Sequence, residues 1–159
     1  MTISKGSYSI TTDKNLMDID FIHRFLATSY WAEGITKEII SKCVRGSLCF
    51  GVFENQKNVM PDRPQGPVGR QVGFARMVTD EATFAYLADV FIADDHRGKG
   101  LSKWLMEVIL AHDGLQGLRR ILLATRDAHG LYAQFGFTPL SFTDRWMQIH
   151  NPDVYKNIT

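Results

Sequence analysis

The sequence has few cysteines and no excess of either charge, and each scarcity narrows the class of protein. Its two cysteines, Cys43 and Cys49, form no CxxC pair and have no histidine at metal-ligand spacing. We therefore expect two buried, reduced thiols and no metal site. The 18 basic and 17 acidic residues give a net charge of +1, which provides no global attraction for nucleic acid or a membrane surface. We expect neither as a partner, so any anion site must be local.

Long apolar runs are also absent. No stretch approaches the length that spans a bilayer, and residues 1–14 lack the apolar core of a signal peptide. With the reduced thiols, this predicts a soluble, cytoplasmic protein. A length of 159 residues is sufficient for one self-supporting core, so we expect a single domain over 1–159.

Apolar patterning predicts a mixed α/β domain with a mostly antiparallel first half and a later βαβ crossover. Three of the five prolines fall within 55–69, which predicts a long turn at a hairpin tip. The predicted helices are 15–31, a helix that Thr36 caps and Gly46 ends, 100–113 and 128–135. The predicted strands are 8–13, 47–54, 70–80, 82–93, 119–127, 136–141 and 145–150.

The stretch DDHRGKGLSKWLM, residues 94–106, places two glycines between a predicted strand and a predicted helix. A helix start offers unpaired N–H groups and the positive end of the dipole, so it attracts anions. Gly98 and Gly100 remove the Cβ atoms that would keep a phosphate away, and Arg97 and Lys99 add positive charge. This chemistry suits a phosphate or pyrophosphate, although a glycine-rich connection without a ligand is the plain alternative.

Neither common nucleotide signature is present in this stretch. The P-loop pattern fails because Ala93 stands where its first glycine would be. The dinucleotide pattern GxGxxG fails because Lys103 replaces its third glycine.

Two motifs resemble the GNAT superfamily of acyl-CoA-dependent N-acyltransferases. The run LADVFIADDHRGKGLSKWLMEVIL resembles the family's hydrophobic strand, [QR]xxGx[GA] loop and amphipathic helix. Asp95 departs from the usual Gln or Arg at the first loop position. The segment AHGLYAQFGF, residues 128–137, resembles the AxxLYxxxGF element, with Tyr132 at the tyrosine position. The predicted order of strands and helices also matches the family across nearly the whole chain.

The resemblance implies a mostly antiparallel central sheet with helices on both faces and acetyl-CoA as co-substrate, without a metal. The strand 82–93 would splay from 119–127 and open a V-shaped slot for pantetheine. Pantetheine would pair with main-chain groups of Val90, Phe91 and Ile92. The pyrophosphate would bind the amides of Arg97, Gly98, Lys99, Gly100, Leu101 and Ser102.

Tyr132 is the candidate general acid, because a phenol close to the sulfur can protonate the departing thiolate. Asp89 and Glu33 are the candidates for the base that deprotonates the amine, directly or through a water molecule. Each of these carboxylates could instead be a structural or surface group. We expect His96 and His129, which adjoin the cofactor elements, to face solvent.

The acceptor pocket should contain aromatic walls that hold an organic cation, although the same residues are good core fillers. The candidates are Tyr30, Trp31, Phe84, Tyr86 and Trp146. The acceptor is expected to be a small-molecule or peptide amine, and the sequence leaves open whether the protein is a homodimer.

The resemblance therefore predicts an N-acetyltransferase. Direct transfer in a ternary complex is favoured, because neither cysteine has a histidine and an acid beside it. The alternative is a non-catalytic acyl-CoA sensor that keeps the cofactor slot. A nucleic-acid binder that uses the basic residues near the loop lacks the net charge and interleaved aromatics that such a function needs.

Overall fold

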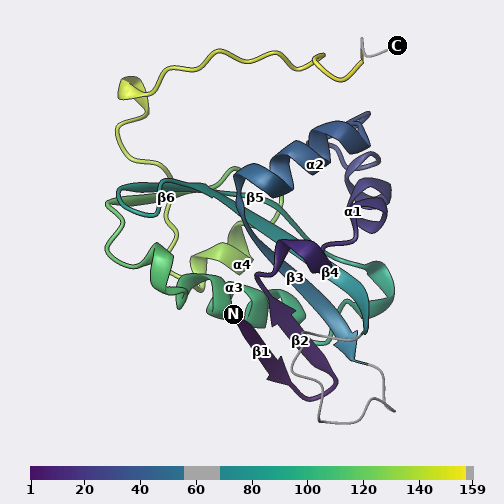
Figure 1. Ribbon diagram of the computed structural model, residues 1–159. Helices are drawn as coiled ribbons and strands as arrows, with labels where there is room; N and C mark the ends of the chain where they lie inside the picture. The colour runs from purple at the N-terminus through teal and green to yellow at the C-terminus, as the bar shows by residue number, and fades with distance from the viewer. Residues whose placement is uncertain (56–68, 157–159) are drawn as a thin grey trace.

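The computed structural model describes residues 1–55 and 69–156 (Figure 1). The turn predicted over 55–69 lies, apart from its two end residues, outside the described residues. No helix within the described residues combines the length and the hydropathy needed to cross a bilayer.

A mixed six-stranded sheet forms the centre of the molecule, with its strands side by side in sequence order (Figure 1). Neighbouring strands are antiparallel except for the last two, which are parallel. The strands are β1 (Thr2–Lys5), β2 (Tyr8–Thr11), β3 (Leu48–Asn55), β4 (Gly69–Thr79), β5 (Phe84–Ile92) and β6 (Arg120–Leu122).

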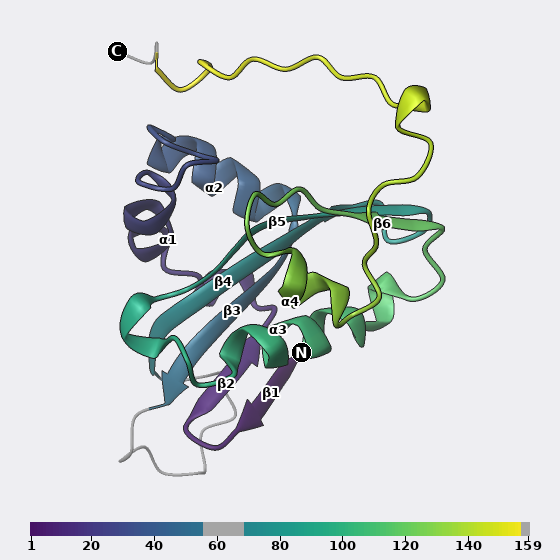
Figure 2. The ribbon, with the colours of Figure 1, turned by 180° about the vertical axis from the view of Figure 1, so that it is seen from behind.

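Helices cover both faces of the sheet, and each pair of helices closes its own apolar core (Figures 1 and 2). Asp18 and Thr36 cap the first two helices by accepting hydrogen bonds from Phe21 N and Ile39 N. On one face lie α1 (Ile19–Leu26) and α2 (Lys37–Gly46), and on the other lie α3 (Leu101–Leu110) and α4 (His129–Ala133).

The N-terminal part differs from the prediction in two places. The segment predicted as the first strand is in fact the second, β2. It is preceded by β1, with which it pairs across a turn at Gly6, whose φ is +59°. The helix predicted over 15–31 is a short 3-10 turn at Lys14–Leu16 followed by α1. Asp18 interrupts the predicted helix because its backbone is extended and its side chain caps a separate helix, α1.

Two predicted closing strands, 136–141 and 145–150, are absent, and the chain there runs without regular pairing except for a 3-10 turn at Thr143–Arg145. Alternation of apolar and polar side chains indicates that a strand could bury one face. A stable strand also needs the edge of another strand to pair with. No strand of the described chain pairs with these residues. The strand predicted over 119–127 is shorter than expected and consists of β6 alone, because the chain separates from β5 after Leu122.

A bulge and a splay shape the end of the sheet where the site lies. Phe74 pairs with Phe91 and Arg76 with Ala88, so one residue of β4 faces two residues of β5. Within this bulge Asp89 has a φ of +54°. The parallel ladder between β5 and β6 ends at the pair Tyr86 and Leu122, which confirms the predicted splay and places it between the last two strands.

Candidate active site

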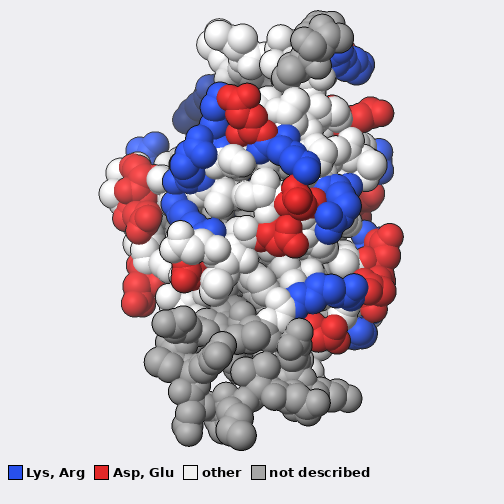
Figure 3. Space-filling view, turned by 45° about the vertical axis from the view of Figure 1, so that its right-hand side comes forward, with Lys and Arg blue, Asp and Glu red and all other residues white. Residues whose placement is uncertain are grey.

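A cleft of about 1400 Å³ opens where β5 and the chain after β6 diverge. Residues 87–92 form one wall and residues 123–128 the other. The glycine loop and the start of α3 close one end, and Tyr30 and Trp31 line the other. On the face shown in Figure 3, basic and acidic side chains are interspersed, so no single charge dominates that surface.

The glycine loop presents backbone amides to the cleft. Gly98 and Gly100 have φ values of +74° and +76°, in the left-handed region that favours glycine. Because Gly100 occupies the N-cap of α3, no side chain caps this helix. The N–H groups of its first turn, at Leu101 and Ser102, are therefore available to an anionic ligand.

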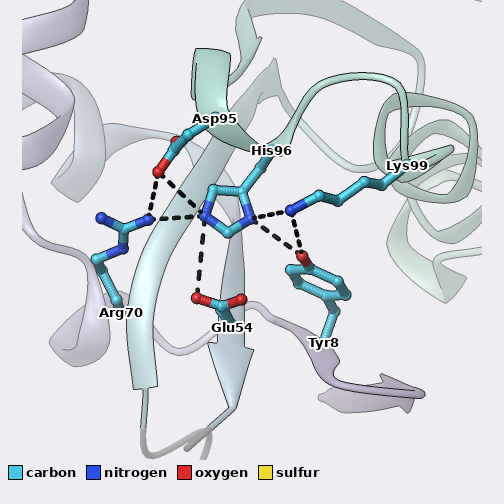
Figure 4. Close-up of polar contacts among 6 residues, drawn as sticks. All are labelled: Tyr8, Glu54, Arg70, Asp95, His96 and Lys99. Carbon is cyan, nitrogen blue, oxygen red and sulfur yellow. Dashed lines mark hydrogen bonds and ion pairs between the residues drawn. The ribbon is translucent and has the colours of Figure 1, made fainter.

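A buried histidine, His96, makes polar contacts at the base of this loop (Figure 4). His96 is only 3% exposed, so the expectation that it faces solvent is wrong, whereas His129 is exposed as expected. Arg70 Nη2 lies 2.7 Å from His96 Nε2, and Tyr8 Oη lies 3.0 Å from His96 Nδ1. Since an arginine can only donate, the contact with Arg70 makes Nε2 of His96 an acceptor.

Lys99 belongs to the cluster around His96 and not to the cleft. Its Nζ donates to Tyr8 Oη at 3.2 Å, and the side chain is directed toward the tyrosine and histidine (Figure 4). Beside it, Arg70 also donates to Asp95 at 2.7 Å. The cluster thus fastens the base of the loop to β2 and β4, and the charge of Lys99 is held there and not in the cleft.

Tyr132 projects from α4 into the cleft and is 9% exposed. Its ring packs edge-on against Phe137, with ring centres 5.9 Å apart. Burial, with a smaller effect of Tyr30, raises the pKa of the Tyr132 phenol above its usual 10.0. The phenol is therefore protonated at neutral pH, as a proton donor must be.

Asp89 lies in the bulge of β5 with its side chain only 8% exposed. Its Oδ2 accepts from Arg76 Nε at 2.5 Å, and its Oδ1 accepts from Trp31 Nε1 at 3.2 Å. Arg76 is itself 17% exposed and also donates to Ser47. Both oxygens of the carboxylate are thus held by side chains that, like Asp89, line the cleft.

The loop between α1 and α2 joins the two walls of the cleft at its far end. Tyr30 Oη accepts from the backbone N–H of Arg126 at 3.2 Å, and the Arg126 guanidinium lies 3.9 Å from the centre of the Tyr30 ring. Trp31 reaches the opposite wall through its bond to Asp89. Tyr155, near the C-terminus, also lines this end.

The family model of the GNAT acetyltransferase domain matches residues 46–139, more than half of the chain. This chain belongs to the GNAT acetyltransferase family. A relative from Gibberella zeae, FG08082, a candidate acetyltransferase by name, is 32% identical over 143 residues, which cover 82% of this chain and 78% of that protein. Human N-acetyltransferase 8B is 31% identical over 125 residues, 72% of this chain and 49% of that protein.

Solved GNAT structures agree with the fold. A candidate GNAT acetyltransferase from Xanthomonas campestris pv. campestris is 45% identical, with a TM-score of 0.84 over 96% of this chain and 99% of that chain. These comparisons confirm the predicted family and the predicted mixed α/β fold.

Most of the candidate site residues gather around the cleft, but four do not. Phe84 and Trp146 line a separate, smaller pocket at the start of β5 and β6, where the Arg120 guanidinium lies 4.7 Å from the Trp146 ring centre. Glu33 is exposed and lies outside the cleft lining, as does Lys99. The cleft lining includes Val90, Phe91, Ile92, Arg97, Gly98, Gly100, Leu101, Ser102, Tyr30, Trp31, Tyr86, Asp89 and Tyr132.

Arg76 and Tyr155 are among the cleft residues that sequence reasoning missed. Arg76 interrupts the apolar run of β4, and a charge in a buried strand signals a buried partner. No comparable signal marks Tyr155, because its place depends on the path of the chain after α4.

Proposed function

We propose that this chain transfers an acetyl group from acetyl-CoA to a primary amine by direct attack in a ternary complex. The observation that carries the proposal is the meeting of three features in one cleft: the free edge of β5, the uncapped start of α3 and the side chain of Tyr132. A protein of Clostridium acetobutylicum with the same fold, 14% identical and with a TM-score of 0.59, is described with acetyl-CoA.

Acetyl-CoA would bind mainly through the backbone. Beyond Tyr86 the β6-facing edge of β5 has no ladder partner among the described residues, so main-chain groups of Val90, Phe91 and Ile92 can pair with the pantetheine amides as an added strand does. The amides of residues 97–102 would receive the pyrophosphate, with Arg97 adding charge beside them.

Tyr132 would donate the proton that the leaving thiolate needs. The amine nitrogen attacks the thioester carbonyl, the C–S bond breaks, and the phenol protonates the sulfur. The raised pKa of Tyr132 keeps the proton in place until thiolate forms.

Asp89 would attract the ammonium form of the acceptor and take its proton, directly or through a water molecule. Of the two carboxylates considered for this role, it is the one that lines the cleft, and we give Glu33 no role. Direct transfer also agrees with the cysteines, since burial raises the pKa of the Cys49 thiol to about 11, which disfavours a nucleophilic thiolate.

One observation favours the alternative of a non-catalytic acyl-CoA sensor. Arg76 and Trp31 already occupy both oxygens of Asp89, and an arginine partner weakens a carboxylate as a base. Binding of acetyl-CoA without turnover would support this alternative.

A thiol-release assay over a panel of primary amines tests the transferase. We expect acetyl-CoA and one class of amine together to release free CoA, with loss of that release in Tyr132→Phe. Release that is equally fast without any amine, or with the variant, would contradict the assigned chemistry.

A further inference from the structure

The cluster around His96 joins an ionisable ring to the glycine loop. The ring is buried, and five titratable side chains from three strands and from the loop segment face it (Figure 4): Tyr8 of β2, Glu54 of β3, Arg70 of β4, Asp95 and Lys99. An imidazole changes its charge between about pH 5 and 8. A change of pH can therefore act on the loop through this ring.

On one side of the ring, Nε2 has neighbours that suit either charge state. It accepts from Arg70 Nη2 at 2.7 Å, while Oδ2 of Asp95 and Oε2 of Glu54 lie 3.5 and 3.9 Å away. An imidazolium carries a proton on both ring nitrogens, so protonation would turn an N–H group against the Arg70 donor. The hydrogen bond from Arg70 holds the pKa of Asp95 below its usual range. This carboxylate therefore stays charged in mild acid and can accept from the protonated ring.

On the other side, the ring lies against a cation that belongs to the loop. Nδ1 of His96 is 3.0 Å from Tyr8 Oη and 3.4 Å from Lys99 Nζ. A positive ring would repel the ammonium group at this separation. Lys99 stands between Gly98 and Gly100, whose φ values are both positive. Release of its side chain would therefore free the part of the backbone whose amides are offered to an anion.

We propose that His96 in its neutral form positions the glycine loop for acetyl-CoA, and that protonation of its ring replaces Arg70 by a carboxylate, releases Lys99 and weakens cofactor binding. An anion site at a helix start depends on N–H groups that point at the ligand. Loss of their fixed positions therefore outweighs the attraction of one added charge. The effect on acetyl-CoA rests on the proposed function, whereas the change in the loop does not.

Hydrogen exchange of the unaltered, unliganded protein tests the change in the loop. The N–H groups of His96 and Arg97 donate to the carbonyls of Ala93 and Asp94, so opening of the loop exposes them to exchange. From about pH 8 to pH 5, we expect the protection factors of these two amides to fall about fivefold or more. The amides of α1 serve as the internal reference and should keep their protection. Constant protection of the loop amides down to the acid end would overturn the proposal.

Calorimetric titration with acetyl-CoA over the same pH range tests the effect on the cofactor. We expect the Kd of the unaltered protein to rise about fivefold or more in acid. In His96→Gln it should stay nearly constant, because a glutamine can accept from Arg70 and cannot be protonated. The matched control is His129→Gln, which alters an exposed histidine outside the cleft lining and should keep the full pH dependence. Titration of acetyl-CoA itself is common to all three proteins and cancels in the comparison.

Two calorimetric results would overturn the proposal: a Kd for the unaltered protein that is constant or falls in acid, or the same pH dependence in His96→Gln. Absence of acetyl-CoA binding at every pH would contradict the proposed function instead. The exchange measurement uses neither ligand nor variant, so it would then decide by itself whether His96 controls the loop.

Discussion

The two ends of the cleft present different groups to a ligand, backbone at one end and side chains at the other. At the end where we propose that acetyl-CoA binds, the surface offered to a ligand is backbone: the free edge of β5 and the amides around Gly98 and Gly100. At the other end, where we propose that the acceptor amine binds, it consists of side chains, among them Trp31 and Asp89, which are joined by a hydrogen bond. Backbone tolerates many substitutions as long as its path is kept, whereas a side-chain site changes with each residue. Cofactor binding should therefore depend on few positions and acceptor choice on many.

The largest expected effect comes from Asp89→Ala. Removal of this carboxylate leaves the largely buried Arg76 without its ion-pair partner, which costs about 3–5 kcal/mol of unfolding free energy, and it also removes the charge that we propose attracts the amine. Urea denaturation at pH 7 measures the loss. The control is Asp20→Ala, whose ion pair with Lys37 is exposed on both sides and should contribute little. Equal stability of the two variants would refute a structural role for the Asp89–Arg76 pair.

Tyr132→Phe should affect turnover and leave cofactor binding intact. Loss of a general acid lowers the rate by about 10²–10⁴-fold, and the packing against Phe137 is preserved. Steady-state kinetics gives kcat, and calorimetry gives the Kd for acetyl-CoA. Parallel loss of both quantities would mean that the hydroxyl binds the cofactor instead of donating a proton.

The raised pKa of Tyr132 makes a prediction about pH. Because the acid must be protonated, activity is lost as pH rises through its pKa, and burial moves that loss above pH 10.0. A pH profile of kcat measures the pH at which this loss of activity occurs. A fall that begins near neutrality and is absent from Tyr132→Phe would contradict the burial argument.

Gly100→Ala tests the backbone end with a smaller expected effect, about tenfold in the Kd for acetyl-CoA. A side chain at positive φ costs about 1–2 kcal/mol and shifts the amides that would hold the pyrophosphate. Gly117→Ala is the matched control, since Gly117 also has a positive φ, +71°, with open space around it. We expect similar losses of stability in both variants and an altered Kd in the first alone.

Trp31→Phe should give the smallest effect, confined to the acceptor end. It removes the hydrogen bond to Asp89, which is worth about 1 kcal/mol, and so raises the KM for the amine about fivefold. The Kd for acetyl-CoA should not change. If that Kd rises while the KM for the amine is constant, the two ends are not separate.

The sequence predicted elements whose partners are local. Thr36 capped α2 as expected, and the glycine loop preceded α3 as its motif indicates, because both depend on residues a few positions apart. Features that depend on distant packing were not predictable. The burial of His96 requires Tyr8 and Arg70, and the missing strands at 136–141 and 145–150 require an edge that periodicity cannot supply.

Calorimetric titration of the purified protein with acetyl-CoA, with ADP as the comparison ligand, tests the central claim most directly. We predict one acetyl-CoA per chain, bound more tightly than ADP because the β5 edge holds pantetheine in addition to the pyrophosphate. Absence of binding at millimolar acetyl-CoA would contradict the account and remove both the transferase and the sensor.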